Sequence, residues 1–230
     1  MASKLQRILK KAWRVFLVLF VAQLVYIILL RWVDPPITVT QFSSWVNGDG
    51  LKRDYIDIDD MSPNIRLAVI ASEDQLFPDH NGFDIASIKE AFINRNKKWK
   101  RVRGASTISQ QVAKNVFLWQ GRSWIRKGLE AYTTFMIELV WGKKRILEMY
   151  LNVSEMGKGV YGIEAASRYY FKKSAKKLSR MEAALITAGL PNPKKYKINP
   201  PSNYVAQRGE QIVAQMNNIE PDEDIQALLK

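Results

Sequence analysis

Residues 73–84 read Glu73-Asp74-Gln75-Leu76-Phe77-Pro78-Asp79-His80-Asn81-Gly82-Phe83-Asp84, and they hold four acids together with the only histidine of the chain. The apolar residues 67–71 come directly before Glu73, so this acid lies at the edge of a segment that we expect to be buried. A carboxylic acid in such a position is a candidate for a perturbed pKa and for acid–base chemistry. An acidic surface turn is the alternative, because Asn-Gly pairs are common in turns. This stretch alone supports both interpretations equally.

The composition is that of a folded, basic protein. The chain has 230 residues, of which 47% are hydrophobic, so a disordered tail is excluded and one domain with an appendage is expected. It has no cysteine, which excludes disulfides and thiolate chemistry. The formal net charge of +13 implies an anionic partner: nucleic acid, anionic lipid or a phosphorylated substrate.

The N-terminal region resembles a membrane anchor. Residues 15–30 carry no charge, and Gln23 is their only strongly polar member. Tryptophan and arginine flank this stretch on both sides, at Trp13, Arg14, Arg31 and Trp32. A spanning helix needs roughly 20 residues, and these flanking types suit a membrane interface. We therefore predict a transmembrane signal-anchor helix over residues 15–33, uncleaved because no small-residue cleavage site follows it. A buried core helix is the alternative.

The charges beside the anchor predict its orientation. Residues 1–14 hold five basic side chains and no acid, at Lys4, Arg7, Lys10, Lys11 and Arg14. By the positive-inside rule, this basic tail is cytoplasmic and the rest of the chain lies outside the cytoplasm. That placement argues against a nucleic-acid partner and favours a lipid headgroup or a lipid-linked phosphate. Residues 34–60, with their turn residues, are expected to form a periplasmic stalk with a short hairpin.

From residue 61 to residue 230 the pattern is mainly helical, starting at Ser62-Pro63. Capping-box spacing at Thr107 and Gln110, and again at Ser179 and Glu182, predicts two helix starts. A long helix is expected between Gly121 and Gly142. Further helices are predicted over residues 106–117, 144–152, 181–189 and 208–217.

Polar residues recur at helical spacing in three further stretches. Residues 104–111 bring Gly and hydroxyls to a helix start, where free N–H groups can bind an anion. Spacing of three and four residues places Arg126 and Lys127 beside Glu130, and Glu148 beside Asn152. Taken singly, each pair is an ordinary polar contact on a helix surface.

Taken in order, these stretches resemble the five motifs of the monofunctional biosynthetic peptidoglycan transglycosylases. That family, glycosyltransferase family 51, is homologous to the glycosyltransferase module of class A penicillin-binding proteins. The resemblance covers roughly residues 67–200. The first two motifs correspond to Glu73-Asp74-x-x-Phe77-x-x-His80-x-Gly82-Phe83-Asp84 and to Gly104-x-Ser106-Thr107-Ile108-x-Gln110-Gln111-x-x-Lys114-Asn115, with Ser109 where Thr is usual. The others correspond to Arg126-Lys127-x-x-Glu130, Ile146-Leu147-Glu148-x-Tyr150-Leu151-Asn152 and Leu178-Ser179-x-x-Glu182-Ala183-x-Leu185.

The resemblance implies a mainly α, lysozyme-like glycosyltransferase domain over residues 61–230, with a smaller membrane-proximal jaw lobe at about residues 85–125. It implies polymerisation of lipid II into β-1,4-linked glycan strands, with inversion and release of undecaprenyl pyrophosphate. The implied partners are lipid II, the growing glycan chain, membrane lipids, and other cell-wall synthesis or division proteins. Because nothing follows Lys230, we expect no transpeptidase domain.

The chemistry of the side chains in these motifs suggests a role for each of them in the reaction. Partial burial should raise the pKa of Glu73, which suits a general base for the 4-hydroxyl of the acceptor sugar. Cations stabilise a departing pyrophosphate, and Lys114, Arg126 and Lys127 are the candidates. The other substrate-binding candidates are Asp74, Ser106, Gln110, Gln111, Asn115, Glu130 and Asn152. Structural roles within the first motif are expected for Phe77, His80, Gly82 and Asp84.

Glu148 is the expected second acid. By resemblance it positions the pyrophosphate, orients Arg126 or holds a divalent cation. Mg²⁺ and Mn²⁺ both prefer oxygen ligands, but the chain shows no compact metal-ligand motif, so no cofactor is expected to be obligatory.

Residues 85–103 alternate apolar and basic side chains, as an interfacial segment does. More aromatic and apolar residues follow, and we predict the same lipid contact for Phe117, Leu118, Trp119 and Trp124. A solvated charge run beside ordinary core aromatics is the alternative.

Two rival functions remain. A lytic glycosidase would also use a glutamate with a raised pKa, but a neutral leaving sugar needs no cluster of cations. A membrane-tethered scaffold that binds anionic lipid would explain the anchor and the charge, but not the acids.

Overall fold

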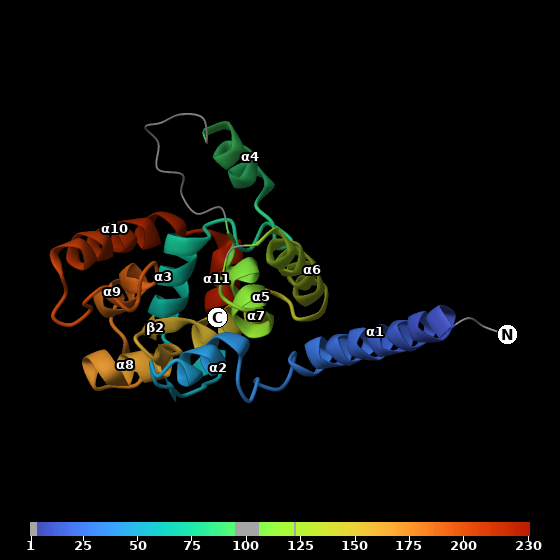
Figure 1. The fold of residues 1–230 in the computed structure, drawn as a ribbon. Coiled ribbons are helices and arrows are strands. Elements are labelled where there is room, and N and C mark those ends of the chain that lie inside the picture. The colour runs from blue at the N-terminus through green and yellow to red at the C-terminus, as the bar shows by residue number, and fades with distance from the viewer. Residues whose placement is uncertain (1–3, 95–105, 122) are drawn as a thin grey trace. The chain divides into compact units, whose positions relative to one another are not determined.

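The structure is a computed structural model that describes residues 4–94, 106–121 and 123–230. The chain forms two compact units, Met1–Pro35 and Pro36–Lys230, and each is described by itself (Figure 1).

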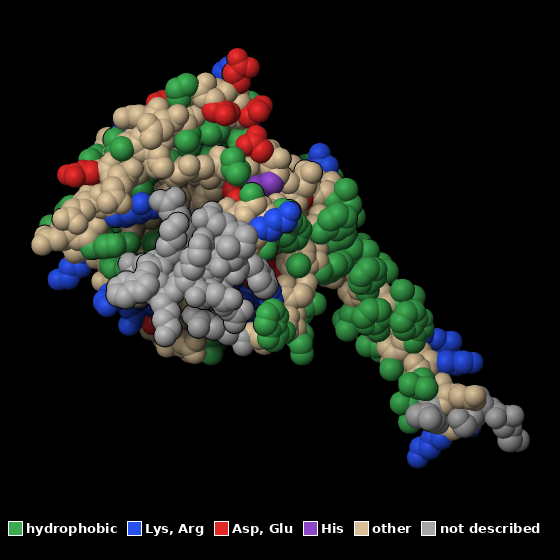
Figure 2. All heavy atoms as spheres, turned by 90° about the horizontal axis from the view of Figure 1, so that it is seen from above, with side chains coloured by type: hydrophobic (Ala, Val, Ile, Leu, Met, Phe, Trp, Pro, Cys, Tyr) green, Lys and Arg blue, Asp and Glu red, His purple; other side chains and the backbone are tan. Residues whose placement is uncertain are grey.

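The first unit is one apolar helix, α1 (Lys4–Leu29). Its stretch Gln6–Leu29 has 24 residues and a mean hydropathy of 2.2, which fits a single-pass membrane anchor. Figure 2 shows hydrophobic side chains along α1 and Lys and Arg near its N-terminal end. The helix starts earlier than predicted, because the Leu, Lys and Arg residues before Val15 are good helix formers. It also ends before the predicted residue 33, since residues 30–32 form a turn.

The predicted stalk is wrong, because residues 36–60 belong to the second unit. Helix α2 (Val39–Val46) starts with a capping box between Thr38 and Gln41, whose side chains are buried. Strand β1 (Lys52–Arg53) then pairs in parallel with β3 (Val160–Tyr161), so no hairpin forms. The turn residues Gly48 and Gly50 adopt positive φ and connect α2 to β1.

The rest of the second unit is mainly helical, which confirms the predicted class. After the 3-10 helix η1 (Ile58–Asp60) come the helices α3 (Pro63–Glu73), α4 (Ile85–Asn94), α5 (Ile108–Phe117), α6 (Trp124–Val140), α7 (Lys143–Val153), α8 (Ile163–Phe171), α9 (Arg180–Gly189), α10 (Asn203–Ile219) and α11 (Glu223–Leu229). A 3-10 helix, η2 (Ala175–Lys177), links α8 to α9, and strand β2 (Glu155–Gly157) completes a small sheet in the order β1-β3-β2.

The core is built around α3 and α5. Helix α3 packs against α9, α10 and α11, and α5 packs against α2, α6 and α7 (Figure 1). Residues 65–71 of α3 are all buried, so this helix is covered on every side. It starts as predicted, with Ser62 as N-cap and Pro63 in the first turn. The residue that ends this buried helix is Glu73, as the sequence predicted.

Local signals predicted the helix starts best. Both capping boxes are present, at Thr107 before α5 and at Ser179 before α9. Helices α8 and α11 were not predicted, and α10 extends beyond the predicted residues 208–217 at both ends. The predicted jaw lobe at about residues 85–125 lies partly outside the described residues, and the described helix α5 packs in the core of the second unit.

The structure describes only some of the residues that were predicted to contact lipid. Residues 95–105 lie outside the described residues. Leu118 is buried, so the prediction is wrong for this side chain, while Phe117 is half-buried with its ring centroid 6.1 Å from that of Trp141. Trp119 and Trp124 are exposed.

Candidate active site

Glu73 ends α3 and is half-buried. Its Oε2 accepts a hydrogen bond from Gln111 Nε2 on α5 at 2.9 Å. Burial raises the pKa of the Glu73 carboxyl, while the Gln111 bond and the positive charge of Arg208 oppose that shift. The carboxylate is therefore fixed in direction and has the raised pKa that a general base needs.

Asp74, the next residue, holds the first two motifs together. It is buried, and its Oδ2 accepts the backbone N–H of Ile108, the first residue of α5, at 2.9 Å. Its carboxylate also meets His80 Nε2 at 3.0 Å. These bonds bring the N-terminus of α5 to the end of α3, which places Gln111 beside Glu73.

His80 uses both ring nitrogens within the first motif. Nδ1 accepts the backbone N–H of Gly82 at 3.1 Å. In the neutral ring the other nitrogen, Nε2, then carries the hydrogen atom, and this N–H group donates a hydrogen bond to the Asp74 carboxylate. No ring lone pair is left to accept a proton from a substrate, which agrees with the predicted structural role of His80.

The loop after Glu73 is fastened to three helices. Lys143 Nζ on α7 donates to the His80 carbonyl and, at 2.8 Å, to Glu138 on α6. Thr107 Oγ1, before α5, donates to the Gly82 carbonyl at 2.7 Å. The Lys143 ammonium also lies 4.6 Å from the centre of the Phe77 ring. The predicted structural residues Phe77, His80 and Gly82 therefore do lie in one fastened loop.

Asp84 closes the same loop at its other end. It accepts the backbone N–H of Ser87 at 2.8 Å in the first turn of α4, and the hydrogen bonds it accepts there lower its pKa against the effect of burial. Glu138 and Lys143 were missed from the sequence. They belong to two helices that meet across Gly142, so no helical spacing relates them.

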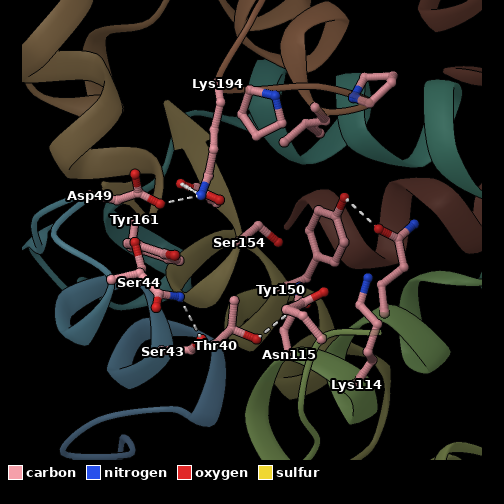
Figure 3. A pocket seen from close by; sticks show the side chains of 17 residues that line it. Thr40, Ser43, Ser44, Asp49, Lys114, Asn115, Tyr150, Ser154, Tyr161 and Lys194 are labelled. Atoms are coloured by element: carbon pink, nitrogen blue, oxygen red, sulfur yellow. Dashed lines mark hydrogen bonds and ion pairs between the residues drawn. The ribbon is translucent and has the colours of Figure 1, made fainter. Parts of the chain in front are cut away.

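Two cavities meet beside Glu73. The larger, about 640 Å³, is lined by Glu73, Asp74 and Ser106. The smaller, about 460 Å³, is lined by Asn115 among others (Figure 3). Gln111 and Lys114 line both cavities, so these two side chains mark their junction. The two cavities therefore adjoin at Gln111 and Lys114.

A cluster of charges adjoins this junction. Glu130 is 4% exposed, and its carboxylate pairs with Lys127 and, at 2.6 Å, with Arg126. Burial lowers the pKa of the half-buried Lys114, while the charge of Glu130 acts on it in the opposite direction. The second and third motifs thus combine three cations with a single acid that holds two of them.

Glu148 does not orient Arg126, which corrects one of its three predicted roles. Its carboxylate pairs with Arg145 and accepts the backbone N–H of Ile58 at 3.3 Å. Arg126 is oriented by Glu130 instead. No cluster of three or more acids or histidines that could hold a metal ion is found among residues 4–94, 106–121 and 123–230.

Two predicted substrate-binding residues, Gln110 and Asn152, are engaged by hydrogen bonds within the protein. Gln110 is 4% exposed and its Oε1 accepts the backbone N–H of Thr107, completing the capping box. Asn152 is buried and bonds both backbone groups of Ile56. Conversely, Arg208 on α10 and Lys194 were missed, although each lines a cavity. No motif signal links them to Glu73, because they come from parts of the chain far apart in sequence.

The fold and this site define a helical enzyme that pairs one acid of raised pKa with a cluster of cations and carries an N-terminal helix that fits a membrane anchor. Residues 39–217 match the family described as Transglycosylase. The chain belongs to the transglycosylase family.

Its relatives include proteins named "Biosynthetic peptidoglycan transglycosylase". That of Mannheimia succiniciproducens is 60% identical over 166 residues, which cover 72% of this chain and 68% of the relative. That of Yersinia pseudotuberculosis serotype O:3 is 53% identical over 182 residues, which cover 78% and 76%. A Yersinia pestis relative is 52% identical over the same length.

Proposed function

We propose that this chain is a peptidoglycan glycosyltransferase in which Glu73 is the general base. It polymerises lipid II into the glycan chain of the bacterial cell wall. The observation that carries the assignment is the half-buried carboxyl of Glu73, raised in pKa and hydrogen-bonded to Gln111 beside Lys114. A sugar hydroxyl is a poor nucleophile until a base removes its proton, and Glu73 is placed to do so.

The reaction forms one bond and breaks another at the same carbon. The 4-hydroxyl oxygen of the acceptor attacks C1 of the donor sugar as its proton passes to Glu73. The bond between C1 and the pyrophosphate oxygen breaks, and the electron pair leaves with the undecaprenyl pyrophosphate. Attack from the opposite face inverts C1 and gives a β-1,4 linkage. Because Glu73 lines the larger cavity, the acceptor sugar binds there and the donor sugar in the smaller one.

The cations stabilise the leaving group. Charge grows on the pyrophosphate as its bond breaks, and preorganised cations lower the energy of that state. Lys114 lines the junction of the cavities, and Glu130 fixes Arg126 and Lys127. Since these side chains supply the positive charge, we propose that no divalent cation is obligatory.

The location follows from the anchor. We place α1 in the bacterial inner membrane, with the basic residues before Val15 in the cytoplasm and the catalytic unit in the periplasm, because basic flanks remain inside. Membrane lipids then surround both enzyme and substrate. Other cell-wall synthesis or division proteins are proposed as partners on family resemblance alone.

The test is incubation of the full chain, reconstituted in proteoliposomes, with fluorescent lipid II. We expect a ladder of glycan polymers that muramidase digests, both with and without a chelator. Shortening of preformed strands without new polymer would instead indicate a lytic enzyme. Polymer that disappears with chelator and returns with Mg²⁺ would contradict the metal-independent mechanism.

A further inference from the structure

We propose that α2 (Val39–Val46) lies on the membrane surface, with one face in the lipid interface and the opposite face lining the smaller cavity. The proposed function places only α1 in the membrane. This second contact would hold the substrate cavity at the height of the lipid headgroups.

One face of α2 is apolar and exposed. Val39, Phe42, Trp45 and Val46 are 39, 51, 58 and 64% exposed, respectively. Their spacing of three, three and one places them on one side of the helix. The rings of Phe42 and Trp45 contact edge to face, with centroids 6.2 Å apart. A contiguous exposed patch of this kind marks an interaction surface.

The opposite face belongs to the site. Thr40, Gln41 and Ser44 are buried, and Thr40, Ser43 and Ser44 line the smaller cavity. Figure 3 shows these side chains beside Tyr161 and Asn115, with Lys194 across the cavity. A helix only eight residues long therefore separates the cavity from whatever covers its apolar face.

The short connection between the anchor helix and α2 indicates that lipid covers the apolar face of α2. The anchor helix ends at Leu29 and α2 begins ten residues later, at Val39. Ten residues span at most about 35 Å, so α2 cannot lie far from the bilayer surface. Tryptophan is enriched at membrane interfaces.

The surface continues beyond α2. Gln120 Nε2 donates to Thr40 Oγ1 at 3.0 Å and so joins α2 to the loop before α6. That loop carries Trp119, which is 48% exposed, and Trp124 follows it at the start of α6 with 88% exposed. Both are residue types that suit the same interface.

A protein partner fits this face less well than lipid. A stable protein interface buries about 800 Å² on each partner. Eight helical residues extend only about 12 Å, so α2 alone does not supply such an interface, and the additional surface at Trp119 and Trp124 is of the residue type that is enriched at membrane interfaces.

Site-directed spin labelling of the full chain tests the proposal, because the natural sequence has no cysteine. Phe42→Cys and Val46→Cys would be labelled in nanodiscs of phosphatidylethanolamine and phosphatidylglycerol that each hold one copy. Met181→Cys on α9 is the control, since Met181 is also exposed, at 42%. Power saturation compares access of oxygen, which enters lipid, with access of a water-soluble nickel complex.

We expect the ratio of oxygen to nickel access to be several-fold higher at Phe42 and Val46 than at Met181. Nickel access at residue 42 equal to that at residue 181 would overturn the proposal. Protection of residue 42 from both reagents would also overturn it, because it would indicate contact with protein.

An activity measurement adds a second test. Phe42→Ser combined with Trp45→Ser should lower polymerisation of bilayer-embedded lipid II several-fold, with a near-unchanged rate on a water-soluble short-chain analogue. Equal rates of variant and parent in bilayers would contradict the proposal. The labelling result does not depend on catalysis, so it distinguishes failure of this proposal from failure of the proposed function.

Discussion

At Glu73, burial and hydrogen bonding act in opposite directions on one carboxyl group. Burial raises its pKa and the Gln111 bond lowers it. Because the folded pKa is the higher one, the folded state favours the protonated acid. This stabilisation is present below the ordinary pKa of glutamate and is lost as the pH rises through the raised value. At neutral pH the charged Glu73 is therefore a cost to folding that its function requires.

Removal of the Gln111 side chain should move the pH dependence of the reaction. Gln111→Ala deletes a bond that favours the charged carboxylate, so the pKa of Glu73 should rise further. We expect the acid limb of kcat/KM for lipid II polymerisation to shift to higher pH. Gln226→Ala, which removes a bond to the Glu220 carbonyl away from the cavities, is the control and should leave the limb in place. An unshifted limb in Gln111→Ala would show that another group sets it.

Substitution of Glu130, which holds two cations, should affect catalysis more than substitution of Glu148, the acid that the sequence suggested as the second one. Glu130→Gln loosens Arg126 and Lys127, so we expect kcat to fall roughly 10²- to 10³-fold, as for loss of a preorganised electrostatic contact. Glu148→Gln disturbs the contact with Arg145 and Ile58, and should mainly lower stability by about 1–3 kcal/mol. Initial rates and thermal unfolding of both variants check this, and the reverse order of rates would restore Glu148 as the catalytic acid.

At the scale of elements, the site depends on the loop between α3 and α4. Its positions are fixed by α5, α6 and α7 together, through Thr107, Glu138 and Lys143. The loop in turn holds Asp74, which positions the start of α5. The geometry at Glu73 is thus a property of four helices rather than of one motif.

Gly82 tests how tightly this loop is held. Its φ is +85°, and a Cβ there would lie 2.8 Å from Thr134 Cγ2 and 2.9 Å from Glu138 Cγ. We expect Gly82→Ala to destabilise the fold by more than about 1 kcal/mol, through both strain and contact, and to lower activity. The measurement is unfolding in urea together with the polymerisation rate.

Gly128→Ala is the matched control. Gly128 lies inside α6, and a Cβ added there would meet no other atom within 4 Å, so alanine should stabilise the helix by up to about 1 kcal/mol. Equal stability of the Gly82→Ala and Gly128→Ala variants would show that the loop relaxes around an added methyl group without cost.

Local signals account for what could be predicted at this scale. The starts of α3, α5 and α9 were predictable because caps are short-range interactions. The placement of residues 36–60 was not, because the parallel pairing of Lys52 with Val160 joins distant parts of the chain. Gln110 and Gln111 are equally polar neighbours, and only the phase of α5 decides that the first caps a helix while the second reaches Glu73.

At the scale of the whole molecule, the chain combines an anchor with a catalytic unit that has its own core. Since α3 and α5 are covered by helices of the second unit, we expect the fragment 36–230 to fold without residues 1–35. It should unfold cooperatively and polymerise lipid II in detergent micelles. On bilayers it should be slower than the full chain, because α1 no longer holds it there. Circular dichroism and polymer gels check both points, and a fragment without a cooperative transition would contradict the division into two units.

The sequence also predicted much of the function at this scale. The anchor and the mainly helical class could be predicted, because each leaves a contiguous pattern, whereas the grouping of Glu73 with Lys114 rested on the order of the motifs in the family that the chain resembles. The roles of Glu148 and Asn152 could not, because helical spacing does not reveal that these side chains turn toward residues 56–58.

The most direct test of the proposed mechanism is Glu73→Gln in the full chain, assayed with fluorescent lipid II in proteoliposomes. Loss of the general base predicts a polymerisation rate at least roughly 10²-fold lower, with lipid II binding retained. The melting temperature at neutral pH should be equal to or higher than that of the parent, since a partly buried charge is removed. A folded Glu73→Gln variant that polymerises at the parent rate would contradict the assignment of Glu73 as the base.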